Sequence, residues 1–236
     1  MTGDDLLVRL ARAIATTPST RALSESLCLA CRDLAGADSA TLTVGRTTAS
    51  RVTLFATDDT AARLEDLQEI LGEGPGHTAA RSGELETCSL QDGRSAAWPQ
   101  FAVAALDLVG PATLYAVPMR PDDVVFGVMT LYQVTHAESP LAMEGSTLLR
   151  LAAATGSALV RDPQASATEL GQGPWQSRAR VHQATGMIVA QLRLEPEDAL
   201  AVLKAHAYAG ETTLADVAGR VIDRTLRFHP PDERGQ

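Results

Sequence analysis

The residues best suited by type to redox or metal chemistry are three cysteines. Cys28 and Cys31 form a Cys-Leu-Ala-Cys pair, and Cys88 is the only other cysteine among the 236 residues. Such a pair is typical of redox or metal motifs in the right context. Here both members lie in an apolar segment with helical spacing, and three cysteines cannot close a zinc site without a histidine. We therefore interpret them as buried small hydrophobic residues, with a redox-responsive pair as the alternative. The sequence predicts no metal site and no catalytic residues.

A glycine-rich run at residues 72–76, Gly-Glu-Gly-Pro-Gly, is the second candidate for chemistry, since glycine-rich loops can hold phosphates. A phosphate-binding loop also needs a lysine followed by Ser or Thr. The single lysine of the chain, Lys204, lies far from this run, so the run is not such a loop. A phosphoacceptor receiver domain also needs a lysine beside its acidic cluster, and residues 1–174 contain none.

Charge is distributed unevenly along the chain. Residues 1–174 carry 12 Arg and no Lys against 21 acidic residues, a net charge of −9, whereas residues 175–236 carry eight basic and eight acidic residues. A neutral C-terminal part gives no support by net charge for nucleic-acid binding, which usually relies on clustered Lys and Arg. Binding could still depend on basic side chains gathered on one side, namely Arg178, Arg180, Lys204, Arg220, Arg224 and Arg227.

The beginning of the chain gives no sign of a secretory signal or a membrane anchor. The first five residues are acidic, Arg9 and Arg12 interrupt the apolar residues that follow, and no apolar run approaches 18 residues. The sequence therefore predicts a soluble, cytoplasmic protein without a membrane partner.

Residues 1–162 alternate helix and strand signals, which favours an α+β sheet domain. Strands are expected at 40–44, 51–57, 85–90, 112–119 and 124–134, with a hairpin loop at 46–50 and a turn at Pro121-Asp122-Asp123. Helices are expected at 6–15, 23–34, 60–71, after Pro99 and at 141–160. Residues 72–76 are expected to form a turn.

Residues 180–228 contain three short amphipathic helices and no strand signal. The first spans 180–192, and the second begins at Pro196 and ends near Gly210. The third is expected to be capped by Thr212 or Thr213 and to run through Leu226 until Pro230 and Pro231 end it. Gly and Pro in residues 163–174 indicate a linker before these helices.

The three helices carry a set of short motifs that resembles the ANTAR domain. These motifs are Val-His-Gln-Ala-Thr-Gly-Met at 181–187, Glu-Asp-Ala-Leu at 197–200 and Leu-Ala-Asp-Val-Ala at 214–218. The resemblance implies an RNA-binding antitermination module. Many members have a lysine at the position of Thr185, and the combination of Gln183 with Thr185 is similar to an actinobacterial branch.

An RNA face is expected among residues that lie off the apolar stripes and near helix ends. Gly186 would allow close backbone approach, and Tyr208 could stack on a base. The predicted RNA-binding residues are Arg180, Gln183, Thr185, Gly186, Lys204, His206, Tyr208 and Thr212.

The order of elements in residues 20–162 resembles a GAF domain, as found in actinobacterial GAF-ANTAR proteins. The resemblance rests on four short motifs. They are Leu-Gly-Glu-Gly-Pro at 71–75, Trp-Pro-Gln-Phe at 98–101, Ala-Val-Pro-Met at 116–119 and Gly-Val-Met-Thr-Leu-Tyr at 127–132. Relatives often have a cysteine where this chain has Gly76, which disfavours a thiol sensor or a thioether-linked bilin there. The resemblance implies a small-molecule pocket of unknown ligand, and its candidate lining residues are Leu71, Gly74, His77, Trp98 and Phe101. The alternative is that Trp98 and Phe101 are core aromatics.

Together these patterns predict a GAF-like antiparallel sheet domain at 1–162, a linker at 163–174, a three-helix ANTAR domain at 175–229 and a disordered tail at 230–236. The expected function is that of a non-enzymatic, homodimeric transcription antitermination regulator that binds tandem RNA stem-loops under control of the GAF domain. The alternatives are a DNA-binding or purely dimerising helical output and, less favoured, a GAF-type methionine sulfoxide reductase, which would need pocket cysteines.

Overall fold

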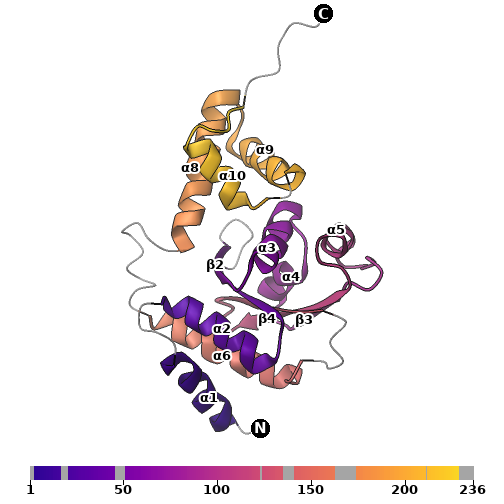
Figure 1. Ribbon diagram of the computed structural model, residues 1–236, viewed down its shortest axis with the longest axis vertical. Coiled ribbons are helices and arrows are strands. Elements are labelled where there is room, and N and C mark those ends of the chain that lie inside the picture. The colour runs from indigo at the N-terminus through magenta and orange to yellow at the C-terminus, as the bar shows by residue number, and fades with distance from the viewer. Residues whose placement is uncertain are drawn as a thin grey trace, which may run out of the picture. The chain divides into compact units, whose positions relative to one another are not determined.

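The computed structural model describes residues 3–16, 21–45, 51–122, 124–134, 141–162, 174–210 and 212–228. The chain divides into two compact units, Met1–Leu170 and Gly171–Gln236 (Figure 1). The hairpin loop expected at 46–50, residue 123 of the expected turn, most of the expected linker and the expected tail at 230–236 lie outside the described residues. Within the described residues, no helix is long and apolar enough to cross a membrane.

The first unit is built on a five-stranded sheet with the order β2-β1-β5-β4-β3. The four pairings are all antiparallel, and the expected α+β class is confirmed. The strands are β1 (Ser39–Val44), β2 (Val52–Ala56), β3 (Glu86–Ser89), β4 (Ala112–Met119) and β5 (Gly127–Val134).

One face of the sheet is covered by α2 (Leu23–Ala35) and α6 (Gly145–Val160), and α1 (Gly3–Ala15) packs on these two helices. Alternate strand residues, such as Leu42 and Met129, point to this face because side chains alternate along a strand. They share a core with Leu27 of α2 and Leu151 of α6. Cys28 and Cys31 are part of this core, as expected for buried small residues.

The other face is covered by α3 (Asp59–Leu71), α4 (Pro75–Ser82) and α5 (Pro99–Val109). Helix α4 was missed by the sequence analysis, which expected only a turn at 72–76. It begins at Pro75, whose fixed φ and missing amide donor suit the first helical position, and it ends at Gly83, which has φ +72°. An eight-residue helix spans only about two turns, which gives little periodicity to detect.

The second unit consists of α8 (Pro174–Leu192), α9 (Pro196–Ala209) and α10 (Leu214–Ile222). Each helix packs on the other two. The buried side chains are small or medium in size, and they are Ala184, Ile188, Ala199, Leu203, Ala207, Val217, Ala218 and Val221. Of the two expected caps, Thr213 is the N-cap of α10, since its side chain accepts a hydrogen bond from the Asp216 amide.

The third of these helices is shorter than expected, because α10 ends at Ile222 rather than continuing through Leu226. Arg224 has φ +60°, and its amide donates to Val221 while the Thr225 amide donates to Arg220. This pair of bonds is the Schellman arrangement that closes helices, usually with glycine in the left-handed position. The following chain turns back, and the Phe228 amide donates to Gln191 Oε1 of α8 at 2.8 Å.

Gly127 of β5 lies where a side chain would meet the backbone of the neighbouring strand β1. A Cβ at this position would lie 2.2 Å from the Thr43 carbonyl oxygen and 2.9 Å from Val44 Cα. Both are backbone atoms and cannot move alone, so Gly127→Ala is expected to destabilise the first unit by about 1–3 kcal/mol. Calorimetry of the full chain should show a lower Tm for the transition of this unit. Gly145→Ala is the matched control, since its Cβ would meet only Leu85 at 3.8 Å; equal Tm values for both variants would contradict the prediction.

Candidate functional site

On helix α8, the predicted RNA-binding residues lie on different sides. Gln183 and Gly186 are exposed and, three residues apart, share one face. A Cβ at Gly186 would meet nothing within 4 Å, so this backbone is open to close approach. Thr185 instead is 8% exposed, and its hydroxyl donates to the Val181 carbonyl at 2.8 Å. The structure therefore leaves Gln183 and Gly186 available to a ligand and turns Thr185 inward.

Arg180 lies on the flank of α8 that faces α10. Its side chain is exposed, and a Cβ placed on Gly219 of α10 would lie 2.9 Å from Arg180 Nη2. The guanidinium group therefore lies directly against the α10 backbone. Gly219 is itself buried.

On helix α9, Lys204 and Tyr208 are four residues apart and share one flank. Tyr208 is 53% exposed, which suits a residue whose ring stacks on a base. His206 lies on the opposite flank, where its ring packs edge-to-face on Phe228 with centroids 5.4 Å apart. His206 thus takes part in the packing of the C-terminal segment.

Thr212 belongs to the cap of α10. Its hydroxyl donates to Asp216 Oδ2 at 3.2 Å, and the Thr213 hydroxyl donates to the same oxygen at 2.7 Å. The eight predicted residues therefore do not form one patch. Arg180, Gln183, Gly186 and Tyr208 present exposed surface, whereas Thr185, His206 and Thr212 make contacts inside the unit.

The aromatic residues proposed to line a ligand pocket lie in the core of the first unit. Phe101 is fully buried and Trp98 is 7% exposed, and both pack with Leu64, while the partly buried Leu71 packs against the same cluster. The indole N–H of Trp98 donates to Thr78 Oγ1 at 2.9 Å. The alternative interpretation of Trp98 and Phe101, as core aromatics, agrees with these contacts.

Gly74 and His77 lie beside the buried side chain of Gln68. A Cβ at Gly74, which has φ +144°, would lie 2.5 Å from Gln68 Oε1, and the Gly76 amide donates to that oxygen at 2.7 Å. His77 Nε2 lies 3.0 Å from the Gln68 carbonyl. The glycines of the 72–76 run therefore make room for a buried amide.

A cluster of buried polar side chains lies between the sheet and α3, and we call Thr43, Arg51, Glu65, Gln68 and Thr130 the polar cluster. Arg51 Nη2 contacts Glu65 Oε2 at 3.1 Å, and these two side chains are 1% and 2% exposed. Glu65 Oε1 also accepts from the Thr41 hydroxyl at 2.7 Å. Burial of an ion pair without full hydrogen bonding is costly.

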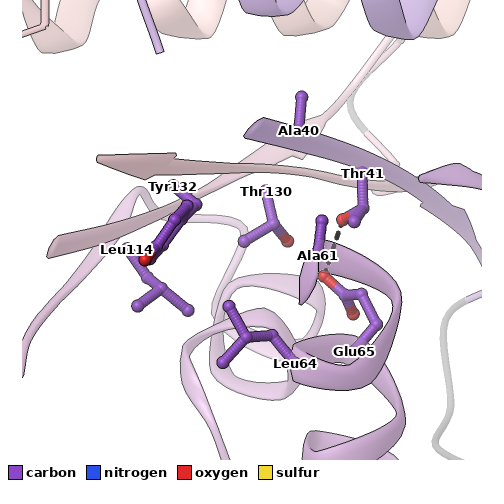
Figure 2. A pocket seen from close by; sticks show the side chains of 8 residues that line it. All are labelled: Ala40, Thr41, Ala61, Leu64, Glu65, Leu114, Thr130 and Tyr132. Carbon is purple, nitrogen blue, oxygen red and sulfur yellow. Dashed lines mark hydrogen bonds between the residues drawn. The ribbon is translucent and has the colours of Figure 1, made fainter. Parts of the chain in front are cut away.

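Several polar atoms of this cluster make no hydrogen bond within the described part of the chain. They are Thr43 Oγ1, Arg51 Nη1, Gln68 Nε2 and Thr130 Oγ1. Thr130 and Glu65 border a cavity of about 10 Å³, with Thr41, Leu64 and Tyr132 also in its lining (Figure 2). Such a volume holds about one water molecule. None of the five predicted ligand residues lines this cavity.

The sequence analysis missed the polar cluster because nothing in the pattern marks it. Thr41, Thr43 and Thr130 read as ordinary strand residues, and Glu65 and Gln68 read as the polar side of a helix. Helical spacing could have predicted that Glu65 and Gln68 are buried. They are three residues apart and lie on the same face of α3 as the buried Leu64 and Leu67.

The three thiols are unsuited to redox chemistry in the folded state. Burial raises the pKa of Cys31 to about 12 and that of Cys88 to about 11, and burial, followed by the Cys31 charge, raises the pKa of Cys28 further. Cys31 Sγ lies 3.2 Å from Thr155 Oγ1. Since the thiolate is the reactive form, these cysteines are packing residues. Among the described residues, no group of three or more His, Cys, Asp or Glu side chains could hold a metal ion.

Comparison with known proteins identifies the second unit. No curated protein matches the chain. Residues 175–222 match the ANTAR domain family, and this range covers α8, α9 and α10. ANTAR domains are the RNA-binding output domains of antitermination regulators, and they have no catalytic role. Residues 175–222 of this chain therefore form an ANTAR domain.

Proposed function

We propose that this protein is a transcription antitermination regulator whose ANTAR domain binds paired stem-loops in nascent RNA. The observation that carries the proposal is the ANTAR match over all three helices of the second unit. Bound stem-loops could not refold into a terminator, so transcription would continue. The chain acts as a binding protein and catalyses no reaction.

Recognition would use the exposed residues of α8 and α9. Gln183 offers an amide to base edges, Gly186 lets the backbone approach the RNA, and Tyr208 provides a ring for an unpaired base. RNA loops are read largely by stacking and by base-edge hydrogen bonds, and this mode needs no large positive charge. It therefore fits a unit whose basic and acidic residues balance.

The first unit would act as a GAF-like sensor that controls the ANTAR domain. The polar cluster supports this role because buried polar groups that lack a hydrogen bond within the described residues are costly to keep. Such costs are commonly found at functional sites. A small polar molecule that pairs with Thr43, Arg51 or Thr130 would remove the cost and stabilise one state of the unit.

A homodimer would bring two ANTAR domains to two stem-loops. Leu7 and Val8 of α1 and Val160 of α6 are each more than half exposed, and α1 and α6 pack against each other. These apolar residues give a second copy of the chain a surface to bury. The dimer would be located in the cytoplasm with the transcription machinery.

Two other outputs are less well supported. A DNA-binding helix needs exposed side chains that can read base edges. The exposed side of α10 and its C-cap carries Asp216, Arg220 and Asp223, and the two acidic residues would repel phosphates. A purely dimerising role would not use the open surface at Gly186 and Tyr208.

Filter binding by the full-length protein tests the proposed RNA target. Filter binding at fixed salt near 150 mM should show preference for an RNA with two tandem hairpins over a loop-scrambled RNA and a duplex DNA, with salt held constant because phosphate contacts depend on it. Equal weak binding to all three would contradict the proposal.

Tyr208 provides a residue-level test. Tyr208→Ala should weaken binding to the tandem hairpins by about 10-fold or more, because stacking contributes about 1–3 kcal/mol per base. Tyr208→Phe keeps the ring and should bind like the wild type. Equal affinity of the wild type, Tyr208→Ala and Tyr208→Phe would show that Tyr208 does not contact the RNA.

Thr130→Val tests whether burial of the polar cluster destabilises the ligand-free protein. The change removes a buried hydroxyl that makes no hydrogen bond in the described structure and should stabilise the ligand-free protein by about 1 kcal/mol. Thr53→Val, on the partly buried edge strand β2, is the control and should change the Tm little. A lower Tm for Thr130→Val would show that the hydroxyl is already paired, and the argument for a ligand would fail.

A further inference from the structure

We infer that Gly219 positions Arg180 as part of an arginine edge that binds RNA phosphates. The edge is formed by Arg180 of α8, Arg220 of α10 and Arg224, which lies just after the end of α10. This inference rests on the proposed RNA-binding function and extends it to α10. It also adds a residue, Gly219, that no sequence motif marked as functional.

The first step is the close approach between Arg180 and Gly219. Only the end of the Arg180 side chain, Nη2 at 2.9 Å and Cζ at 3.7 Å, would meet a Cβ at position 219. A side chain at 219 would therefore displace the guanidinium group rather than the backbone. Glycine is otherwise unfavourable inside a helix, by about 1 kcal/mol relative to alanine, so its presence in α10 fits a need for this contact.

The second step is that the arginine edge is free to bind an anion. Within the described part of the chain, the side chains of Arg180, Arg220 and Arg224 make no hydrogen bond and no ion pair. All three residues are exposed. Arg180 lies against Gly219, and Arg220 is the next residue along α10, so both arginines belong to the region where α8 and α10 meet.

Two acidic residues, Asp216 and Asp223, lie near the arginine edge. Asp216 lies one turn before Arg220, but one of its oxygens accepts hydrogen bonds from Thr212 and Thr213 at the start of α10. Asp223 is exposed at the other end of the helix and limits the positive charge there. The planar, always charged guanidinium fork suits phosphate oxygens, and RNA supplies such oxygens in a regular row. The edge would hold the RNA backbone while Gln183 and Tyr208 contact bases.

The test compares the full-length wild type with Arg180→Ala, Gly219→Ala and the double variant, by filter binding to the tandem-hairpin RNA over a range of salt concentrations. Each single change should weaken binding by roughly 10-fold and reduce the slope of log K against log salt by about 1, the loss of one phosphate contact. The Tm of Gly219→Ala should equal or exceed that of the wild type, since alanine favours the helix. The double variant should bind no more weakly than Arg180→Ala, because Gly219 acts only through Arg180.

Each failure has a separate meaning. Wild-type affinity and slope in Gly219→Ala, with weakened Arg180→Ala, would overturn the positioning role. Wild-type behaviour of Arg180→Ala would overturn the arginine edge while leaving hairpin preference, and so the proposed function, intact. Absence of hairpin preference in the wild type would overturn the proposed function itself. Arg94→Ala, in the first unit, controls for the loss of one exposed positive charge.

A second variant covers the case in which Gly219→Ala unfolds. Arg180→Lys leaves Gly219 unchanged and keeps the charge but replaces the planar fork with an ammonium group. It should keep the salt slope of the wild type and lose several-fold in affinity. Affinity equal to that of the wild type would show that placement of the guanidinium group is unimportant.

Discussion

Both faces of the sheet in the first unit are covered by helices, and this constraint determines where polar residues can lie. Every residue of β1 is buried, so its threonines must find polar partners or remain unsatisfied. Ala40, Leu42 and Val44 meet the apolar core under α2 and α6, while Thr41 and Thr43 face α3. The buried pair of Arg51 and Glu65 fits this arrangement, because α3 packs on this face of the sheet and supplies the matching carboxylate.

The same constraint gives the glycine-rich run a structural role. Gln68 is fully buried and needs a donor for its side-chain oxygen, which the Gly76 amide supplies. Glu73 of the run accepts a hydrogen bond from the Phe101 amide in the first turn of α5 at 2.7 Å. The run thus connects α3, α4 and α5, and its glycines reflect backbone packing rather than phosphate binding.

Periodicity predicted most of the fold, since long amphipathic helices and alternating strands carry strong signals. It failed at α4, whose eight residues are too few for a periodic pattern, and at the end of α10, where Arg224 adopts a conformation that usually requires glycine. The sequence narrowed the N-cap of α10 to Thr212 or Thr213, and the structure has Thr213. A cap can be predicted because its hydrogen bond joins residues only three positions apart. The RNA-face candidates were harder to predict, since the burial of Thr185 and the contact of His206 with Phe228 depend on how three helices pack.

In a small three-helix unit, few residues are available for both a stable core and a binding surface. Its core contains mainly alanine and valine side chains, so the helices approach closely and polar groups reach across the contacts. Gln191 holds the Phe228 amide, and Phe228 in turn packs on His206, which shows that the folded unit continues beyond the matched range of 175–222. Small residues at these contacts also leave room for a long side chain to cross from one helix to the next. Arg180 lies on Gly219 in this way, so the close packing that holds the three helices together also sets the position of an exposed guanidinium group.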